Sequence, residues 1–136
     1  MADTFELEIV TPDKLVVKTR VEEIQIPARK GYIGVLPGHA PLITELAVGE
    51  VTYRTGPTVV NLSLAWGFAE VLPDKVTLLA ETAEHAEDID VERAESARQR
   101  AQQHLQEAQT AEDYERATSA LQRADTRLQV AGKANK

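Results

Sequence analysis

The sequence predicts a β-sandwich followed by an antiparallel pair of helices. Up to about residue 80, short segments with alternating apolar residues are separated by turn residues at intervals of about eight to twelve, with no helical period. From about residue 84 there is no proline and only one glycine, and Ala, Gln, Glu and Arg, which favour helix, predominate. We therefore expect two parts, residues 1–85 and residues 86–136.

Composition and charge exclude several classes of protein. The 136 residues carry a formal net charge of −7, which argues against binding of nucleic acid or an anionic membrane, because both need clustered basic side chains. The absence of cysteine excludes disulfides, thiolate catalysis and Cys-based metal sites. No apolar run reaches about 18 residues, and the N-terminus does not resemble a signal peptide. We expect a soluble cytosolic protein, or one peripheral to a cytosolic assembly, without direct membrane insertion.

The strands are predicted from alternation and from turn chemistry. Phe5, Leu7 and Ile9 alternate with glutamates, as in a half-buried strand. Further alternating segments follow up to residue 80, separated by proline-containing turns at residues 11–14, 55–58 and 72–75. Helical crossovers do not fit between these segments, so antiparallel pairing is expected.

The stretch Arg29–Thr44 is dense in residues that constrain the backbone. It holds three of the seven glycines and two of the six prolines, with bulky apolar residues among them, which predicts a long turn that packs on something. A phosphate-binding loop is disfavoured because the Gly-Lys-Ser/Thr ending is missing. His39 lies in this stretch with only Glu45 nearby as a carboxylate, so a structural or interface role is favoured over catalysis.

Trp66 and Phe68 form the largest apolar pair of the chain. The favoured interpretation is that they pack in the core, and the alternative is that they face outward as a docking patch. Gly67 between them suggests a bulge or a close approach of another strand. The three histidines show no spacing typical of metal ligands.

Two helices of about 18 residues each are predicted in the second part. Asp88 or Asp90 can cap the first, and Thr110 can cap the second. Taken together, the apolar stripes of the two helices consist mostly of alanine, and each alanine buries little area, so the hairpin should be weakly held. The hairpin could therefore switch between a closed and an opened conformation, although a static two-helix appendage is the simpler interpretation.

A possible anion site lies at the open end of this hairpin. In an antiparallel pair, Asp90 and Arg93 at the start of one helix lie beside the end of the other, where Arg123 and Arg127 share a face. Guanidinium groups beside a carboxylate suit a polyphosphate with its ribose or base. Surface salt bridging is the alternative, and from spacing alone it is favoured.

Several segments, in order, resemble the epsilon subunits of F-type ATP synthases of the bacterial or chloroplast type. They are Ile9–Pro12, Gly31–Thr44, Leu46–Gly49, Gly67–Phe68 and Glu70–Val71. The resemblance covers the whole chain. It implies a ten-stranded β-sandwich followed by two helices.

The resemblance also implies a function and partners. The subunit would be a non-catalytic part of the rotor that couples proton-driven rotation to ATP synthesis, peripheral on the cytoplasmic face of the inner membrane or its thylakoid equivalent. Its sandwich would bind the gamma subunit and the ring of c subunits, and its helices, when extended toward the alpha and beta subunits, would inhibit ATP hydrolysis. A free-standing nucleotide-sensing module and a generic sandwich adaptor are the alternatives.

Particular residues carry these implied roles. No cofactor is obligatory, but some relatives bind ATP as a regulatory ligand, and the matching positions are Ile89, Asp90, Arg93, Ala94, Arg123 and Arg127, with Glu84 placed to join them. The implied interface residues are Arg29, Lys30, Tyr32 and His39. Tyr32 stands where some relatives have an acidic residue in the loop that faces the c ring, so the detail of that contact differs here.

Overall fold

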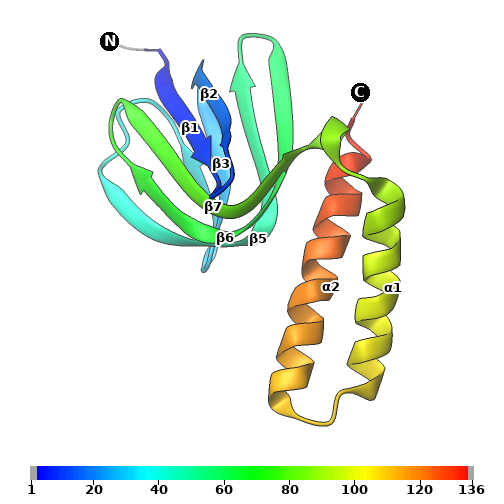
Figure 1. Cartoon of the computed structure of the whole chain (residues 1–136). Coiled ribbons are helices and arrows are strands. Elements are labelled where there is room, and N and C mark those ends of the chain that lie inside the picture. The colour runs from blue at the N-terminus through cyan, green and yellow to red at the C-terminus, as the bar shows by residue number, and fades with distance from the viewer. Residues whose placement is uncertain (1–2, 135–136) are drawn as a thin grey trace. The chain divides into compact units, whose positions relative to one another are not determined.

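The computed structural model describes residues 3–134. The chain divides after His85 into two compact units, a β-sheet unit and a helical unit, and each is described by itself (Figure 1). Every strand belongs to the first unit and both long helices belong to the second.

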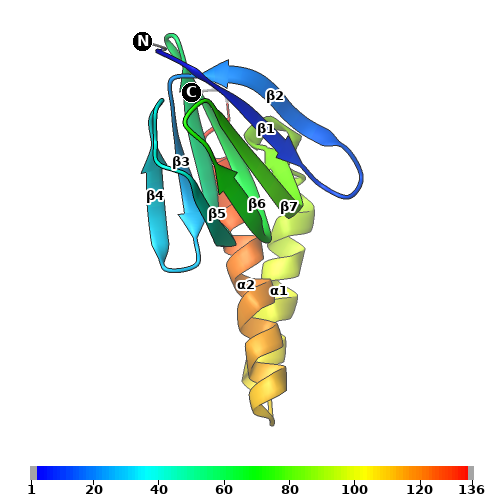
Figure 2. The same cartoon turned by 90° about the vertical axis from the view of Figure 1, so that its left-hand side faces the viewer.

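The first unit is a single curled sheet of seven strands in the order β2-β1-β7-β6-β5-β3-β4 (Figure 2). All neighbouring pairs are antiparallel except β1 and β7, which run parallel. No helix is needed to connect this parallel pair, because the strands between them in the sequence form the connection. The strands are β1 (Phe5–Val10), β2 (Leu15–Val21), β3 (Glu23–Ala28), β4 (Gly31–Val35), β5 (Leu42–Thr55), β6 (Thr58–Val71) and β7 (Lys75–His85).

Each of the three long strands reverses its inward-facing side part-way along its length. In β6 the core residues are Leu62 and Leu64 and then, at odd positions, Ala69 and Val71. In β5 and β7 the buried residues also change from even to odd positions, between Leu46 and Val51 in β5 and between Ala80 and Ala83 in β7. Both changes lie beside the reversal in β6. Counting each long strand as two segments converts seven strands into ten, which agrees with the ten-stranded sandwich that the resemblance implies.

The backbone of Trp66 and Gly67 produces the reversal in β6. Both have positive φ, +56° at Trp66 and +137° at Gly67. A Cβ on Gly67 would lie 1.9 Å from the carbonyl oxygen of Leu79, so only glycine fits against β7. The close approach predicted at Gly67 is confirmed.

The core of the sheet unit is apolar, and each of the seven strands contributes residues to it. It consists of Phe5, Leu7, Ile9, Val17, Val21, Ile24, Ile26, Val35, Leu46, Val51, Tyr53, Leu62, Leu64, Ala69, Val71, Val76, Leu78, Ala80 and Ala83. The favoured placement of Trp66 and Phe68 in this core is wrong. Trp66 is half-buried and Phe68 is 54% exposed, because the reversal turns the position after Gly67 outward.

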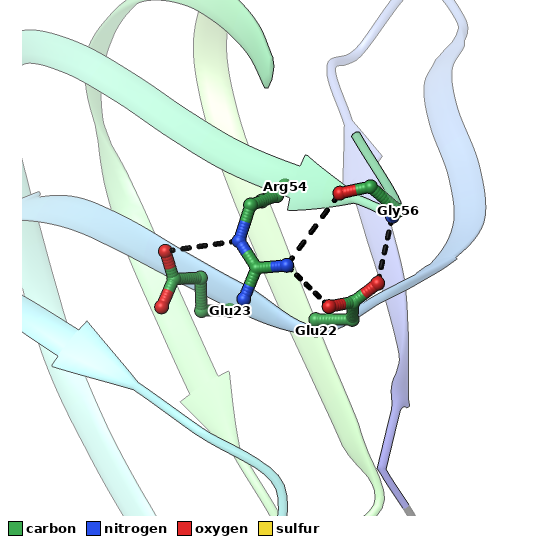
Figure 3. A network of polar contacts seen from close by, with 4 residues as sticks. All are labelled: Glu22, Glu23, Arg54 and Gly56. Atoms are coloured by element: carbon green, nitrogen blue, oxygen red, sulfur yellow. Dashed lines mark hydrogen bonds and ion pairs between the residues drawn. The ribbon is translucent and has the colours of Figure 1, made fainter. Parts of the chain in front are cut away.

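A polar network joins the β5–β6 turn to the junction of β2 and β3 (Figure 3). Arg54 Nη1 pairs with Glu22 Oε2, and its Nε lies 3.5 Å from Glu23 Oε1. The other oxygen of Glu22 accepts a hydrogen bond from the Gly56 N–H at 2.7 Å. The Gly56 hydrogen bond, with that from Arg54, lowers the pKa of Glu22 below its usual value.

The second unit is an antiparallel helical hairpin. A short 3₁₀ turn (Ala86–Asp88) precedes α1 (Val91–Glu107) and α2 (Ala111–Ala131). Of the two predicted caps for α1, Asp90 is the one used, and it accepts a hydrogen bond from the Arg93 N–H at 3.1 Å. Thr110 caps α2 by accepting from the Asp113 N–H at 3.0 Å. Four alanines are buried along the two helices, Ala94, Ala101, Ala117 and Ala124, in agreement with the alanine-rich seam expected from the sequence.

Candidate functional site

A groove of about 700 Å³ opens on the surface of the sheet unit. One wall is the turn between β3 and β4 and the other is the start of β5, so most of the lining belongs to the stretch Arg29–Thr44, with Ala28 and Glu45 at its two ends. Three of the four predicted interface residues line it, namely Arg29, Lys30 and Tyr32.

The β3–β4 turn carries the two positive charges of the groove, Arg29 and Lys30. Arg29 forms an ion pair with Glu45 across it, with 2.7 Å between Nη1 and Oε2. The backbone N–H of Arg29 also donates to the Glu45 carbonyl at 2.9 Å, which fixes the turn against β5. Lys30 is exposed beside this pair. Two cations and one carboxylate give the groove an excess of positive charge.

The ring of Tyr32 lies against its own sheet. Its phenol oxygen accepts a hydrogen bond from the Glu50 N–H at 2.9 Å. The close contact requires glycine at position 49, because a Cβ there would lie 2.6 Å from both the phenol oxygen and Pro27 Cβ. The hydroxyl is therefore used to hold the β3–β4 hairpin on β5.

His39 lies outside the residues that line the groove. Its Nδ1 is 2.6 Å from the Ala40 carbonyl oxygen, so Nδ1 carries the proton and donates it to that acceptor. The preceding Gly38 N–H donates to the Pro73 carbonyl at 2.8 Å, which ties this loop to the β6–β7 turn. The structural and interface roles both stay predictions for His39.

Three apolar side chains on neighbouring strands face outward and form what we call the apolar patch: Ile43 (73% exposed), Phe68 (54%) and Leu79 (55%). Phe68 lies directly opposite Leu79 on β7 and opposite Glu45 on β5, and Ile43 is two residues before Glu45. Sequence reasoning missed Ile43 and Leu79. The reversal at Gly67 turns these side chains outward, because it inverts the alternation of buried and exposed residues in all three strands.

The predicted nucleotide residues of the hairpin divide into buried and exposed groups. Ile89 is buried against Ala86 and Val130, which places the start of α1 beside the end of α2. Ala94 is fully buried in the seam, whereas Asp90 and Arg93 are exposed at the start of α1.

The two arginines of α2 differ in exposure. Arg127 is half-buried, one turn before Val130, so it lies toward the same end of the hairpin as the α1 N-terminus. Arg123 is exposed one turn farther away and donates to Ser119 Oγ at 3.3 Å.

Glu84 is on β7, opposite Ser63 of β6, and belongs to the sheet unit. A hollow of about 490 Å³ in the hairpin lies near the α1–α2 turn, lined by residues such as His104 and Asp113, at the end opposite to Asp90.

Comparison with known families covers nearly the whole chain. Residues 4–86 match the beta-sandwich domain of the ATP synthase delta/epsilon chain, and residues 87–132 match its long alpha-helix domain. The ATP synthase epsilon chain of Koribacter versatilis is 66% identical over 106 residues, which cover 78% of this chain and 75% of that one. The epsilon chain of Geobacter sulfurreducens is 46% identical over 135 residues, 98% of each chain. This protein belongs to the ATP synthase epsilon chain family.

Solved structures with the epsilon chain fold occur in ATP synthase complexes. A chain of the Euglena gracilis mitochondrial ATP synthase superimposes with a TM-score of 0.81 at 22% identity, covering 93% of this chain and 80% of that one. A chain of the Tetrahymena thermophila mitochondrial ATP synthase central stalk and c ring gives a TM-score of 0.64 at 12% identity, covering 97% and 96%. At these identities the likeness establishes the shared fold.

The described residues of this epsilon chain hold neither a candidate membrane-spanning helix nor a candidate metal site. Within residues 3–134, no helix is both long and apolar enough to cross a membrane. Over the same residues, no group of three or more His, Cys, Asp or Glu side chains is arranged to hold a metal ion.

Proposed function

We propose that this epsilon chain is a non-catalytic part of the central stalk, and that its sheet unit docks on the gamma subunit and the c ring. The observation that carries this proposal is the apolar patch beside the groove. Ile43 belongs to both, so apolar and charged contacts are available on one continuous surface. Exposed apolar side chains clustered on a sheet face are typical of an interaction surface.

Capture of gamma by the tagged epsilon chain tests the proposal. Phe68→Asp should weaken binding about a hundredfold, because burying a phenylalanine contributes roughly 2–3 kcal/mol and 1.4 kcal/mol is a factor of ten. Val59→Asp is the control, since Val59 is 56% exposed on the same strand but outside the patch. If the wild-type chain fails to capture gamma, the proposal is wrong, and equal binding by the two variants would exclude this face.

In this role the epsilon chain contributes to the coupling of proton-driven rotation to ATP synthesis. Family membership supports this role and a peripheral position on the cytoplasmic face of the inner membrane or its thylakoid equivalent. Both depend on the docking described above, so loss of gamma binding should also release the chain from membranes that contain the assembled synthase.

We further propose that the hairpin regulates the complex by opening toward the alpha and beta subunits and inhibiting ATP hydrolysis. The composition of the seam supports this, because alanine contributes little buried area to hold α1 against α2. Among the described residues, the Thr118 hydroxyl is buried without a hydrogen-bond partner, which also weakens the packed form.

ATP is proposed as the ligand that favours the closed hairpin, bound at the open end by Asp90, Arg93, Arg123 and Arg127, while the other matched positions of the hairpin, Ile89 and Ala94, are buried and support its packing. The convergence of the α1 start and the α2 end supports this. Because Asp90 also caps α1, Asp90→Ala would confound loss of the helix with loss of the ligand.

Calorimetric titration with ATP can separate the two roles of Asp90. Asp90→Asn keeps a capping side chain but removes the charge, so it should bind ATP at least about tenfold more weakly while helix content is unchanged. Arg127→Ala should weaken binding similarly. Arg116→Ala is the control, because Arg116 pairs with Glu112 near the α1–α2 turn. Unchanged titrations for Asp90→Asn and Arg127→Ala would exclude this site.

A further inference from the structure

Strand β5 extends beyond the strand that pairs with it. The register between β3 and β5 ends with Ala28 opposite Leu46, whereas β5 and β6 remain paired as far as Leu42 and Val71. Residues 42–44 of β5 therefore have β6 on one side, and within the described part of the chain they have no strand on the other. We call this the open edge of β5.

The backbone of Ile43 points toward this open edge. The Glu45 carbonyl accepts from the Arg29 N–H, so the backbone groups of Glu45 face the β3 side. Strand geometry repeats every two residues, and the N–H and C=O of Ile43 therefore face the same side. Near the other end of β5 it is Arg54, at an even position, whose carbonyl faces that side and accepts from the Glu22 N–H. The backbone groups that face the β3 side therefore change from odd to even positions along β5, as the reversal of that strand predicts.

The groove gives the open edge a wall and a charge. The residues opposite the open edge belong to the β3–β4 turn, where Lys30 is exposed and Arg29 is already paired with Glu45. Tyr32 also lines the groove, and its phenol oxygen is held by the Glu50 N–H. The remaining positive charge of Lys30 suits a carboxylate on whatever occupies the groove.

We propose that an extended segment of the gamma subunit, carrying an acidic side chain, adds to the open edge of β5 as a short strand. This inference rests on the proposed docking of gamma and specifies its geometry. Strand addition uses main-chain hydrogen bonds for affinity and side chains for specificity. A ring embedded in a membrane presents the ends of spanning helices, whereas strand addition needs an extended segment, so gamma is the fitting partner.

Hydrogen–deuterium exchange of single backbone amides, read by NMR on the wild-type chain alone and in complex with gamma, tests the geometry. The Ile43 amide should exchange at least about tenfold more slowly in the complex, because its N–H becomes hydrogen-bonded. If gamma is captured and the Ile43 amide exchanges at the same rate, the strand addition is wrong while the proposed function stands. If gamma is not captured, both fail.

Substitutions at the open edge provide a second test. Ile43→Pro removes the N–H that, by the periodicity from Glu45, faces the open edge and not β6, and proline is tolerated on an open strand edge. It should bind gamma about fivefold more weakly than Ile43→Val, which keeps the N–H, since one hydrogen bond is lost. Lys30→Glu should weaken binding more than Lys30→Gln. Equal affinities within both pairs would overturn the proposal.

Discussion

At the scale of single residues, Trp66 and Gly67 determine which side chains of the sheet reach solvent. Their positive φ angles turn β6 over within two positions, and the neighbouring strands turn with it. Phe68 thereby leaves the core and joins Ile43 and Leu79 on the outer face. A local backbone feature thus creates the surface to which we assign docking.

Gly67→Ala should destabilise the sheet unit by about 3 kcal/mol or more, because the new Cβ collides with the Leu79 carbonyl in addition to straining the backbone. Gly31→Ala is the matched control. Gly31 has a φ of +132°, close to the +137° of Gly67, but no atom lies within 4 Å of a Cβ placed there. Urea unfolding of both variants measures the difference, and equal losses would contradict the importance of the close approach.

Glu22 should make stability depend on pH. Its pKa is lowered in the folded chain by the Gly56 N–H and by Arg54, so the network stabilises the fold above the usual glutamate pKa. That stabilisation is lost as the pH falls through the lowered pKa. Glu22→Gln should therefore lower the melting temperature more at pH 7 than at pH 3. Glu81→Gln, at an exposed position on β7, should show no such difference.

At the scale of secondary-structure elements, the helices are defined by their ends more than by their packing. Asp90 and Thr110 each satisfy a backbone N–H at the start of a helix. The interface between α1 and α2 contributes less, since its fully buried positions are mainly alanine. The two caps therefore stabilise the hairpin in addition to this packing.

Thr110→Ala should lower the stability of the hairpin by about 1 kcal/mol, because the Asp113 N–H loses its acceptor. Thr110→Ser retains a hydroxyl and should stay close to the wild type. Thermal loss of helix followed by circular dichroism near 222 nm distinguishes the two variants. A Thr110→Ala chain as stable as Thr110→Ser would show that packing, and not capping, holds α2.

The elements differ in how far the sequence could predict them. Alternation located β1, proline-containing turn residues located the turns, and cap residues located the starts of both helices, because these signals are local. Placing Phe68 failed, because its orientation depends on Leu79 of a neighbouring strand approaching Gly67. The Arg29–Glu45 pair and the groove likewise depend on which strands become neighbours, which spacing along the chain does not reveal.

At the scale of the whole molecule, each unit has its own apolar cluster. The core of the sheet unit contains residues between Phe5 and Ala83, and the cluster at the open end of the hairpin lies between Ala86 and Ala134. The sheet unit can therefore be expected to fold on its own residues, which allows docking and regulation to be assigned to different parts of the chain.

A chain that ends at residue 86 should keep a folded sheet and still bind gamma, because the docking surface and its core are retained. In a reconstituted synthase it should also raise the rate of ATP hydrolysis, since the inhibitory helices are absent. Circular dichroism, gamma capture and hydrolysis assays provide the three measurements. An unfolded fragment would contradict independent folding of the sheet unit, and an unchanged hydrolysis rate would contradict inhibition by the hairpin.

The shared reversal in β5, β6 and β7 also limits how the length of the chain can vary. Adding or removing one residue on either side of Gly67 would move every following side chain of that strand to the opposite face. One half of the sandwich would then expose its interior while the other half stayed intact. Insertions and deletions among relatives should therefore fall in the turns, such as residues 29–30 and 36–41, and avoid the long strands.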